Sequence, residues 1–135
     1  MPGSPLLLSL LPVLLLACGG DGGSDITQPG PRPVNSVSIV SGAETKGTAA
    51  YSPNPVTVPV NAVVRWYNDD TGASGGPYGG SSGTVHTVVA NDNNAFNSGN
   101  IQPGRTFERT FATAGTFNYH CSIHPGMQGT VTVTQ

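Results

Sequence analysis

From residue 34 onward, apolar side chains recur at every second position in short blocks that turn residues separate. This period of two is typical of β-strands that bury one face and expose the other. The blocks lie at residues 37–39, 56–60, 62–67, 84–90, 105–111, 116–121 and 129–134. About seven short strands in one domain indicate an all-β, antiparallel sandwich. Pro59 cannot donate a hydrogen bond to a neighbour, so we place its strand at a sheet edge.

Composition limits the size and the partners of this domain. The 135 residues include 19 Gly and 12 Pro, which favours short strands and turns over long helices. A chain of this length has room for one modest domain. Only 9% of the residues are charged and the formal net charge is -2, so no basic surface is available for nucleic acid or anionic lipid.

The first 17 residues contain an apolar run, LLLSLLPVLLLA, at residues 6–17. A run of about a dozen residues is too short to span a membrane comfortably. We interpret it as an export signal. Its end, Leu15-Leu16-Ala17-Cys18, resembles the lipobox of bacterial lipoproteins, which implies cleavage before Cys18 and lipidation of that residue. An ordinary secretory signal or a buried core segment is the alternative, although Pro12 and the glycines after Cys18 disfavour a packed helix.

These boundaries divide the chain into three parts. Residues 1–17 are the expected signal, residues 18–33 an expected Gly/Pro-rich flexible tether, and residues 34–135 the folded domain. The protein is then expected in the bacterial cell envelope, on the periplasmic or extracellular face, with the lipid as its only membrane contact. A further Gly/Ser-rich stretch, residues 69–83, is interpreted either as a mobile flap or as a neutral insertion.

A cluster of metal-ligand residues follows the expected strand at 116–121. Cys121, His124 and Met127 lie at three-residue intervals, so that a compact loop can direct all three side chains to one point. A thiolate, imidazoles and a thioether are ligands that suit copper cycling between Cu(II) and Cu(I). A disulfide between Cys18 and Cys121 is not expected, because one cysteine lies at the lipobox and the other in this cluster.

The strand alternation indicates which histidines can join the cluster. Cys121 shares the inward face with Phe117 and Tyr119, whereas His120 lies on the opposite face and is not assigned as a ligand. His86 is in phase with the apolar residues of its own block, so it can also face the interior. A lone histidine on an apolar face is usually a core residue, but the cluster favours a ligand here.

The chain resembles the cupredoxins, the blue copper family that includes plastocyanin, pseudoazurin and amicyanin. The resemblance covers most of residues 34–135 and depends chiefly on the C-x-x-H-x-x-M loop that begins at Cys121. It also includes the segments Val63-Val64-Arg65-Trp66-Tyr67-Asn68, Phe96-Asn97-Ser98-Gly99, Pro103-Gly104 and Gly115-Thr116-Phe117. The stretch before His86 is longer than such families usually carry.

The resemblance implies a Greek-key β-sandwich of about seven to eight strands, one type 1 copper ion, and electron transfer as a monomer. His86, Cys121 and His124 would be the strong equatorial ligands and Met127 the weak axial one. It further implies that Thr87 offers a hydrogen bond across to the Cys121 loop. The His124 ring edge would meet redox protein donors and acceptors through an apolar patch of Ile123, Pro125 and Gly126.

Other functions remain possible at this point. The same ligands could store copper or deliver it to another envelope protein, although Met-rich or Cys-rich sites are expected for carriers of Cu(I). An enzyme such as a nitrite reductase would need further copper ligands and an open coordination position, and the sequence has only three histidines. We therefore expect no catalytic activity. A purely structural sandwich would leave a complete ligand set unexplained.

Overall fold

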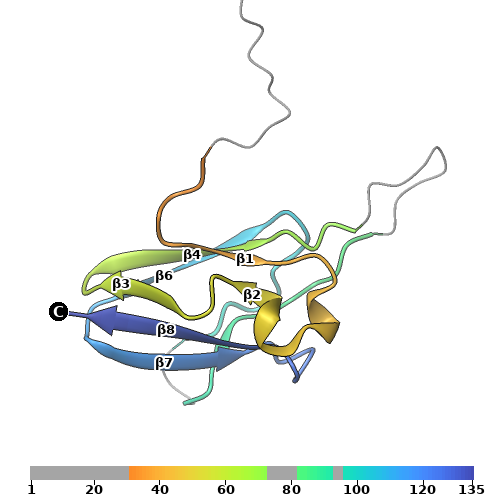
Figure 1. Cartoon of the computed structure of the whole chain (residues 1–135). Coiled ribbons are helices and arrows are strands. Elements are labelled where there is room, and N and C mark those ends of the chain that lie inside the picture. Colours follow the sequence, from red (N-terminus) through yellow and green to blue (C-terminus); the bar gives the residue numbers. More distant parts are fainter. Residues whose placement is uncertain (1–30, 73–81, 93–95) are drawn as a thin grey trace, which may run out of the picture. The chain divides into compact units, whose positions relative to one another are not determined.

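The computed structural model describes residues 31–72, 82–92 and 96–135. Eight strands in these residues form two sheets of four, and the all-β sandwich is confirmed (Figure 1). The strands are β1 (Ser36–Ile39), β2 (Tyr51–Ser52), β3 (Val56–Pro59), β4 (Ala62–Asn68), β5 (Val89–Ala90), β6 (Thr106–Phe111), β7 (Gly115–His120) and β8 (Gln128–Thr134). Two 3-10 turns, η1 (Ala43–Thr45) and η2 (Gly47–Ala50), follow β1. Among the described residues, no helix has the length and apolar character needed to cross a membrane.

The two sheets have the strand orders β2-β1-β4-β6 and β3-β8-β7-β5. Most neighbours are antiparallel, but β1 is parallel to β4 and β3 is parallel to β8, which the sequence did not predict. Only a short hairpin forces two strands to be antiparallel. Long connections separate both parallel pairs along the chain, so the second strand can enter the sheet from the same end. β3 lies at the edge of its sheet, as Pro59 predicted.

The core lies between the two sheets and follows the predicted alternation. Val37 and Ile39 are fully buried, whereas Val63, on the opposite face of its strand, is 45% exposed. Trp66 on β4 meets Tyr119 on β7 edge to face, with ring centroids 5.6 Å apart. Such aromatic pairs contribute about 0.5–1.5 kcal/mol beyond the area that they bury. This contact joins the two sheets through Tyr119, two residues before Cys121.

The predicted strand at residues 84–90 forms only in part. β5 covers Val89–Ala90, and His86 makes an isolated antiparallel bridge with Ile101. His86, Thr87 and Val88 are all buried, so neither face of this segment is left to solvent. The segment therefore crosses the interior near the end of the sandwich instead of extending an open sheet.

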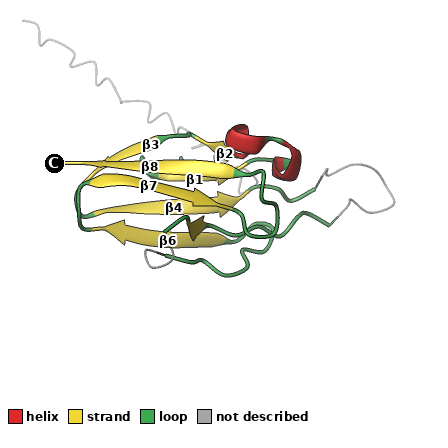
Figure 2. Ribbon diagram, turned by 90° about the horizontal axis from the view of Figure 1, so that it is seen from below, coloured by secondary structure: helices red, strands yellow, loops and turns green. Residues whose placement is uncertain are grey.

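The loop that joins β7 to β8 lies at the end of the sandwich opposite to the C-terminus (Figure 1). η1 and η2 lie at this same end (Figure 2). A Cβ atom on Gly47 of η2 would stand 3.8 Å from the carbonyl oxygen of Gly126 in the loop. The 3-10 turns therefore pack close to the segment that carries Cys121 and His124.

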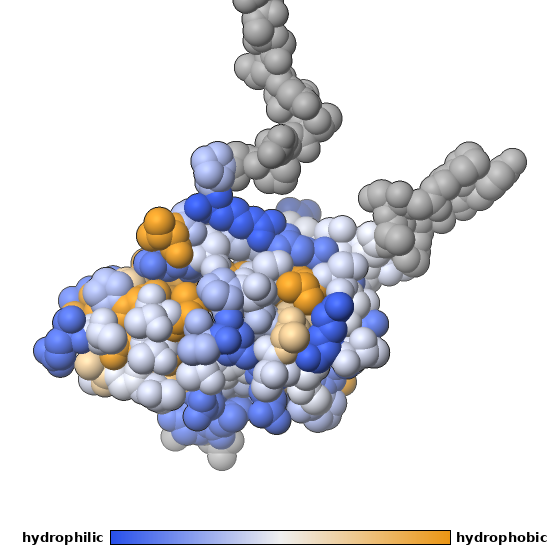
Figure 3. Space-filling model, in the orientation of Figure 1, coloured by the Kyte–Doolittle hydropathy of each residue, from blue (hydrophilic) through white to orange (hydrophobic). Residues whose placement is uncertain are grey.

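The face seen in Figure 3 shows apolar residues only in small areas among hydrophilic ones. Arg32 forms two hydrogen bonds of 2.6 Å with Asp69, and its guanidinium lies 4.3 Å from the ring centre of Tyr67. Thus Arg32, which the sequence placed in the tether, contacts the domain. The expected signal, Cys18, most of the tether and residues 73–81 of the Gly/Ser stretch lie outside the described residues.

Candidate metal centre

Three of the four predicted ligands converge at the end of the sandwich. The Nδ1 atom of His86 lies 4.0 Å from Sγ of Cys121, and Nδ1 of His124 lies 3.7 Å from the same sulfur. One ligand atom from each residue lies within 4.8 Å of the other two. Bonds of about 2.0–2.3 Å from nitrogen and sulfur to a single metal ion require spacings of this size.

Backbone hydrogen bonds fix the two segments that supply these ligands. The amide of Cys121 donates to the carbonyl of Met127 at 3.1 Å, and the amide of Met127 donates to the carbonyl of His124 at 3.0 Å. His86 and Ile101 exchange both of their backbone bonds, at 3.2 and 2.8 Å. The ligand loop is therefore closed on itself, and His86 is held by a separate part of the chain.

Met127, the fourth predicted ligand, is fully buried within the core cluster. His124 is only half-buried, and its neighbours Pro125 and Gly126 are exposed. Ile123 is 45% exposed, which is unusual for a large apolar side chain in this domain. The cluster thus has an inner side closed by the core and an outer side where His124 reaches the surface.

Thr87, which follows His86, contacts the cysteine loop. Its amide lies 3.3 Å from the sulfur of Cys121, and its hydroxyl lies 3.7 Å from that atom. The amide of Ser122 donates to the same hydroxyl at 2.8 Å. The Thr87 side chain therefore links the two ligand-bearing segments.

Neighbouring groups favour the ionised form of the cysteine. Burial opposes the charge on the Cys121 sulfur, but hydrogen bonds from the doubly protonated His86 ring and from the amide and hydroxyl of Thr87 outweigh it and lower the pKa to about 5. Burial likewise opposes a charged His86 ring, while Cys121 and Asp70 raise the pKa of that ring above its ordinary value. The thiolate that a copper ion requires is thus available at neutral pH.

We expect the Cys121 thiol of the metal-free protein to titrate near pH 5 instead of in the ordinary range near pH 9. Thiolate absorbance at 240 nm, followed from pH 3 to 10, measures this midpoint. Subtracting the curve of Cys121→Ser removes the contribution of Cys18. A difference curve with its midpoint above pH 8 would show that the hydrogen bonds to sulfur do not have the inferred effect.

His120 does not join the cluster, in agreement with its place on the opposite face of β7. Its Nδ1 lies 2.7 Å from the side-chain oxygen of Asn91, on the outside of the sheet. The residue that sequence reasoning missed is Asp70, whose Oδ2 lies 2.9 Å from Nε2 of His86. The only sequence signal was its place just after the strand that precedes the Gly/Ser stretch.

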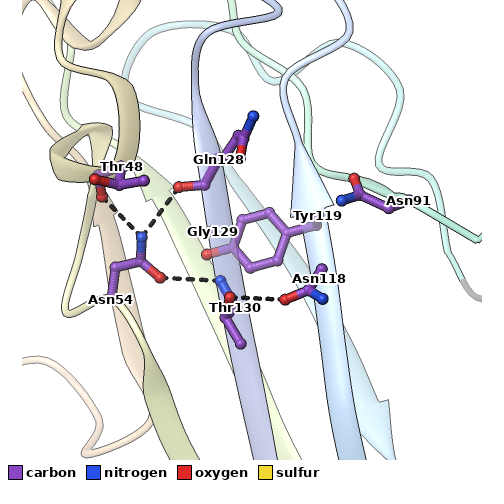
Figure 4. Close-up of a pocket in the computed structure, with 8 residues that line it drawn as sticks. All are labelled: Thr48, Asn54, Asn91, Asn118, Tyr119, Gln128, Gly129 and Thr130. Carbon is purple, nitrogen blue, oxygen red and sulfur yellow. Dashed lines mark hydrogen bonds between the residues drawn. The ribbon is translucent and has the colours of Figure 1, made fainter.

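A polar hollow of about 290 Å³ is separate from the ligands (Figure 4). Its lining residues are Thr48, Asn54, Asn91, Asn118, Tyr119, Gln128, Gly129 and Thr130. Asn54 there uses its whole carboxamide internally, donating to the carbonyls of Thr48 and Gln128 and accepting from the amide of Thr130. These bonds tie the start of β3 to β8, which accounts for the polar lining.

Comparison with known proteins also indicates a copper-binding protein. The model of copper-binding proteins of the plastocyanin/azurin family matches residues 38–134. Plastocyanin from Scenedesmus fuscus is 28% identical over 109 residues, which cover 72% of this chain and 98% of that protein. A purple cupredoxin from Nitrosopumilus maritimus is 30% identical with a TM-score of 0.60, over 73% of this chain and 98% of that chain.

Two further solved structures are similar. A reduced variant of amicyanin is 26% identical with a TM-score of 0.53, over 73% of this chain and 80% of that chain. A copper-containing nitrite reductase from Thermus scotoductus is 28% identical with a TM-score of 0.56, over 78% of this chain but only 23% of that chain. The donor set of one thiolate, two imidazoles and a nearby thioether residue fits the single copper ion of such proteins. This chain belongs to the plastocyanin/azurin family of copper-binding proteins.

Proposed function

We propose that this protein is an electron carrier that uses one type 1 copper ion held by His86, Cys121, His124 and Met127. The observation that carries the proposal is the convergence of both imidazoles on the Cys121 sulfur, at 4.0 and 3.7 Å. Bound copper would supply a one-electron couple between Cu(II) and Cu(I). The residues of the chain supply the fixed geometry.

Rigidity of the ligand cluster favours electron transfer over copper delivery. His86 and Cys121 are fully buried, and backbone bonds hold both segments. A carrier that hands its metal to another protein needs ligands that open toward that partner. A cluster that keeps its shape instead reduces the rearrangement that accompanies each change of metal charge.

The outer side of the cluster suits a brief protein contact. His124 is half-buried beside Ile123, Pro125 and Gly126, all of which are exposed. Transient redox encounters usually bury little surface. We propose that a monomer meets its redox protein donor and acceptor here, with the His124 ring as the point of closest approach.

We further propose that the protein lies in the bacterial cell envelope, held there by lipid on Cys18. The support for this location is the sequence alone, namely the apolar run of residues 6–17 and the lipobox-like segment that ends at Cys18. We also propose no catalytic activity. Within the described residues, the remaining histidine, His120, bonds to Asn91 on the outside of the sheet and adds no further ligand.

Reconstitution with Cu(II) tests the proposed function. We expect an intense thiolate-to-copper absorption band in the visible range, a narrow copper hyperfine splitting in the EPR spectrum, and reversible one-electron voltammetry. Binding of Cu(I) alone, without colour and without a reversible couple, would instead favour storage or delivery. A protein that binds neither ion would contradict both functions.

The hydroxyl of Thr87 is expected to influence the copper potential. Thr87→Val removes the hydroxyl 3.7 Å from the Cys121 sulfur and leaves the Ser122 amide without its acceptor. Hydrogen bonds to the cysteine sulfur tune the potential of such sites, so we expect the reduction potential to fall and the stability to drop by about 1 kcal/mol. Voltammetry and thermal unfolding measure the two effects. Thr87→Ser keeps the hydroxyl and should match the wild type; equal potentials in all three proteins would contradict this role.

A further inference from the structure

The buried ring of His86 has a neighbour on the side away from Cys121. Its Nε2 lies 2.9 Å from Oδ2 of Asp70, while its Nδ1 faces the sulfur. His86 is 0% exposed and Asp70 is 4% exposed, so bulk water does not supply an alternative partner. A buried N–H group without an acceptor costs about 1–3 kcal/mol. The carboxylate therefore stabilises the ring when its proton resides on Nε2.

Hydrogen bonds hold Asp70 in place from several directions. The amide of Gly42 donates to its second carboxylate oxygen at 3.0 Å. The amide of Asp70 donates to the side-chain oxygen of Asn68 at 3.0 Å, and its carbonyl accepts from the amide of Thr84 at 2.9 Å. One carboxylate oxygen of Asp70 meets the Gly42 amide and the other meets the His86 ring. The acceptor that faces His86 is thus a fixed carboxylate.

Asn68 extends this support to both sides of the histidine segment. Its side-chain nitrogen donates to the carbonyl of Thr84 at 2.8 Å and to the carbonyl of Ile101 at 2.9 Å. Ile101 is the backbone partner of His86. Asn68 at the end of β4 and Asp70 two residues later therefore together hold the backbone and the ring of His86.

We propose that Asp70 is a positioning residue of the copper centre, whose carboxylate accepts the Nε2 proton of His86 and so keeps the Nδ1 lone pair directed toward the Cys121 side. The inference rests on the proposed function, because the choice of tautomer matters only if His86 binds copper. Partners of this kind orient ligand histidines and raise their basicity. Asp70 acts through His86.

A fixed negative charge behind one ligand also affects the balance between the two copper charges. Cu(II) carries one more positive charge than Cu(I), so the carboxylate favours the oxidised state. Removing that charge should weaken Cu(II) binding more than Cu(I) binding. The reduction potential of a neutral variant should therefore be higher than that of the wild type.

Asp70→Asn in the full chain tests this inference. The amide is nearly isosteric, but it cannot accept from both Gly42 and His86, because one of its two positions is an NH₂ group. We expect Cu(II) affinity about 10- to 100-fold weaker and a higher reduction potential. In the metal-free protein, ring ¹⁵N shifts followed upward in pH until the ring is neutral should show the Nε2-protonated form of His86 in the wild type. The variant should lose that preference.

Asp69→Asn is the matched control, since it removes the same charge from the adjacent residue. Asp69 pairs with Arg32 and Ser38 and not with His86. Glu44→Gln is a second control, because Glu44 is the exposed carboxylate that lies within 4.8 Å of Asp70 and His86. Both variants should keep the wild-type tautomer and Cu(II) affinity. Equal effects of all three substitutions would attribute the result to general charge and overturn the assignment to Asp70.

The possible outcomes separate the two proposals. A wild-type protein without a reversible couple overturns the proposed function, whatever the variants do. A reversible wild type whose Asp70→Asn form keeps its tautomer, affinity and potential overturns only the role of Asp70. If the variant does not fold, the wild-type ¹⁵N shifts decide, because a ring protonated at Nδ1 contradicts the inference directly.

Discussion

Replacing Cys121 by serine is expected to abolish the intense visible absorption of the copper-loaded protein. The band requires a thiolate bound to Cu(II), and a serine hydroxyl offers no low-energy charge transfer of this kind. The sulfur also lies at the centre of the cluster, at 4.0 and 3.7 Å from the two imidazole nitrogens. Because a hard oxygen suits copper poorly in this set, the affinity should fall as well. Optical and EPR spectra of both proteins measure the effect.

His120→Ala is the matched control for this substitution. His120 precedes Cys121 directly but points to the outside of β7, where it meets Asn91. We expect the band and the EPR spectrum of this variant to match the wild type. If His120→Ala removed the band as thoroughly as Cys121→Ser, the face assignment of β7 and the ligand set would both be wrong.

Gly129→Ala should destabilise the fold severely, although it adds only one carbon atom. Gly129 lies opposite Tyr119 in the β7–β8 pair, and a Cβ atom there would overlap the phenol ring. Tyr119 cannot move aside, because it is fully buried and packs against Trp66 and Tyr51. Overpacking of this kind costs about 3 kcal/mol at the upper end of its usual range, which lowers Tm by roughly 10 °C or more.

Gly126→Ala is the comparison that separates this overlap from a general effect of removing glycine. A Cβ atom on Gly126 would meet no atom within 4 Å. Thermal unfolding of both metal-free variants should therefore show a change within about 0.5 kcal/mol for Gly126→Ala. Similar losses of stability in the two variants would mean that the Tyr119 ring yields, and that the β7–β8 contact is less rigid than the packing indicates.

Sequence patterning predicted the fold class because alternation depends only on neighbouring residues. The inward faces of β1, β4 and β7 follow from it, as does the edge position of Pro59. Alternation could not predict the two parallel pairings, because these depend on how long connections cross the ends of the sandwich. β2 was also missed, because Tyr51–Ser52 is too short to show a period.

The candidate site was predictable to a different extent for each residue. Cys121, His124 and Met127 share one loop, so their spacing alone indicates a common point. The prediction of His86 depended on its phase within a strand and on there being no other histidine predicted to face inward. Asp70 could not be predicted, because its contact with His86 joins two ends of a Gly/Ser-rich stretch whose path depends on tertiary structure.

The parallel pairing of β3 with β8 has a consequence for the order in which the protein assembles. Val56 lies opposite Val131, so β3 has to wait for the last strand of the described chain before it gains its partner. Contacts between such distant segments raise the contact order and slow folding. A nascent chain that has emerged only as far as His86 cannot complete this sheet. Because Cys121, His124 and Met127 lie between β7 and β8, the same late step also closes the loop that carries three of the four ligand residues of the proposed copper centre.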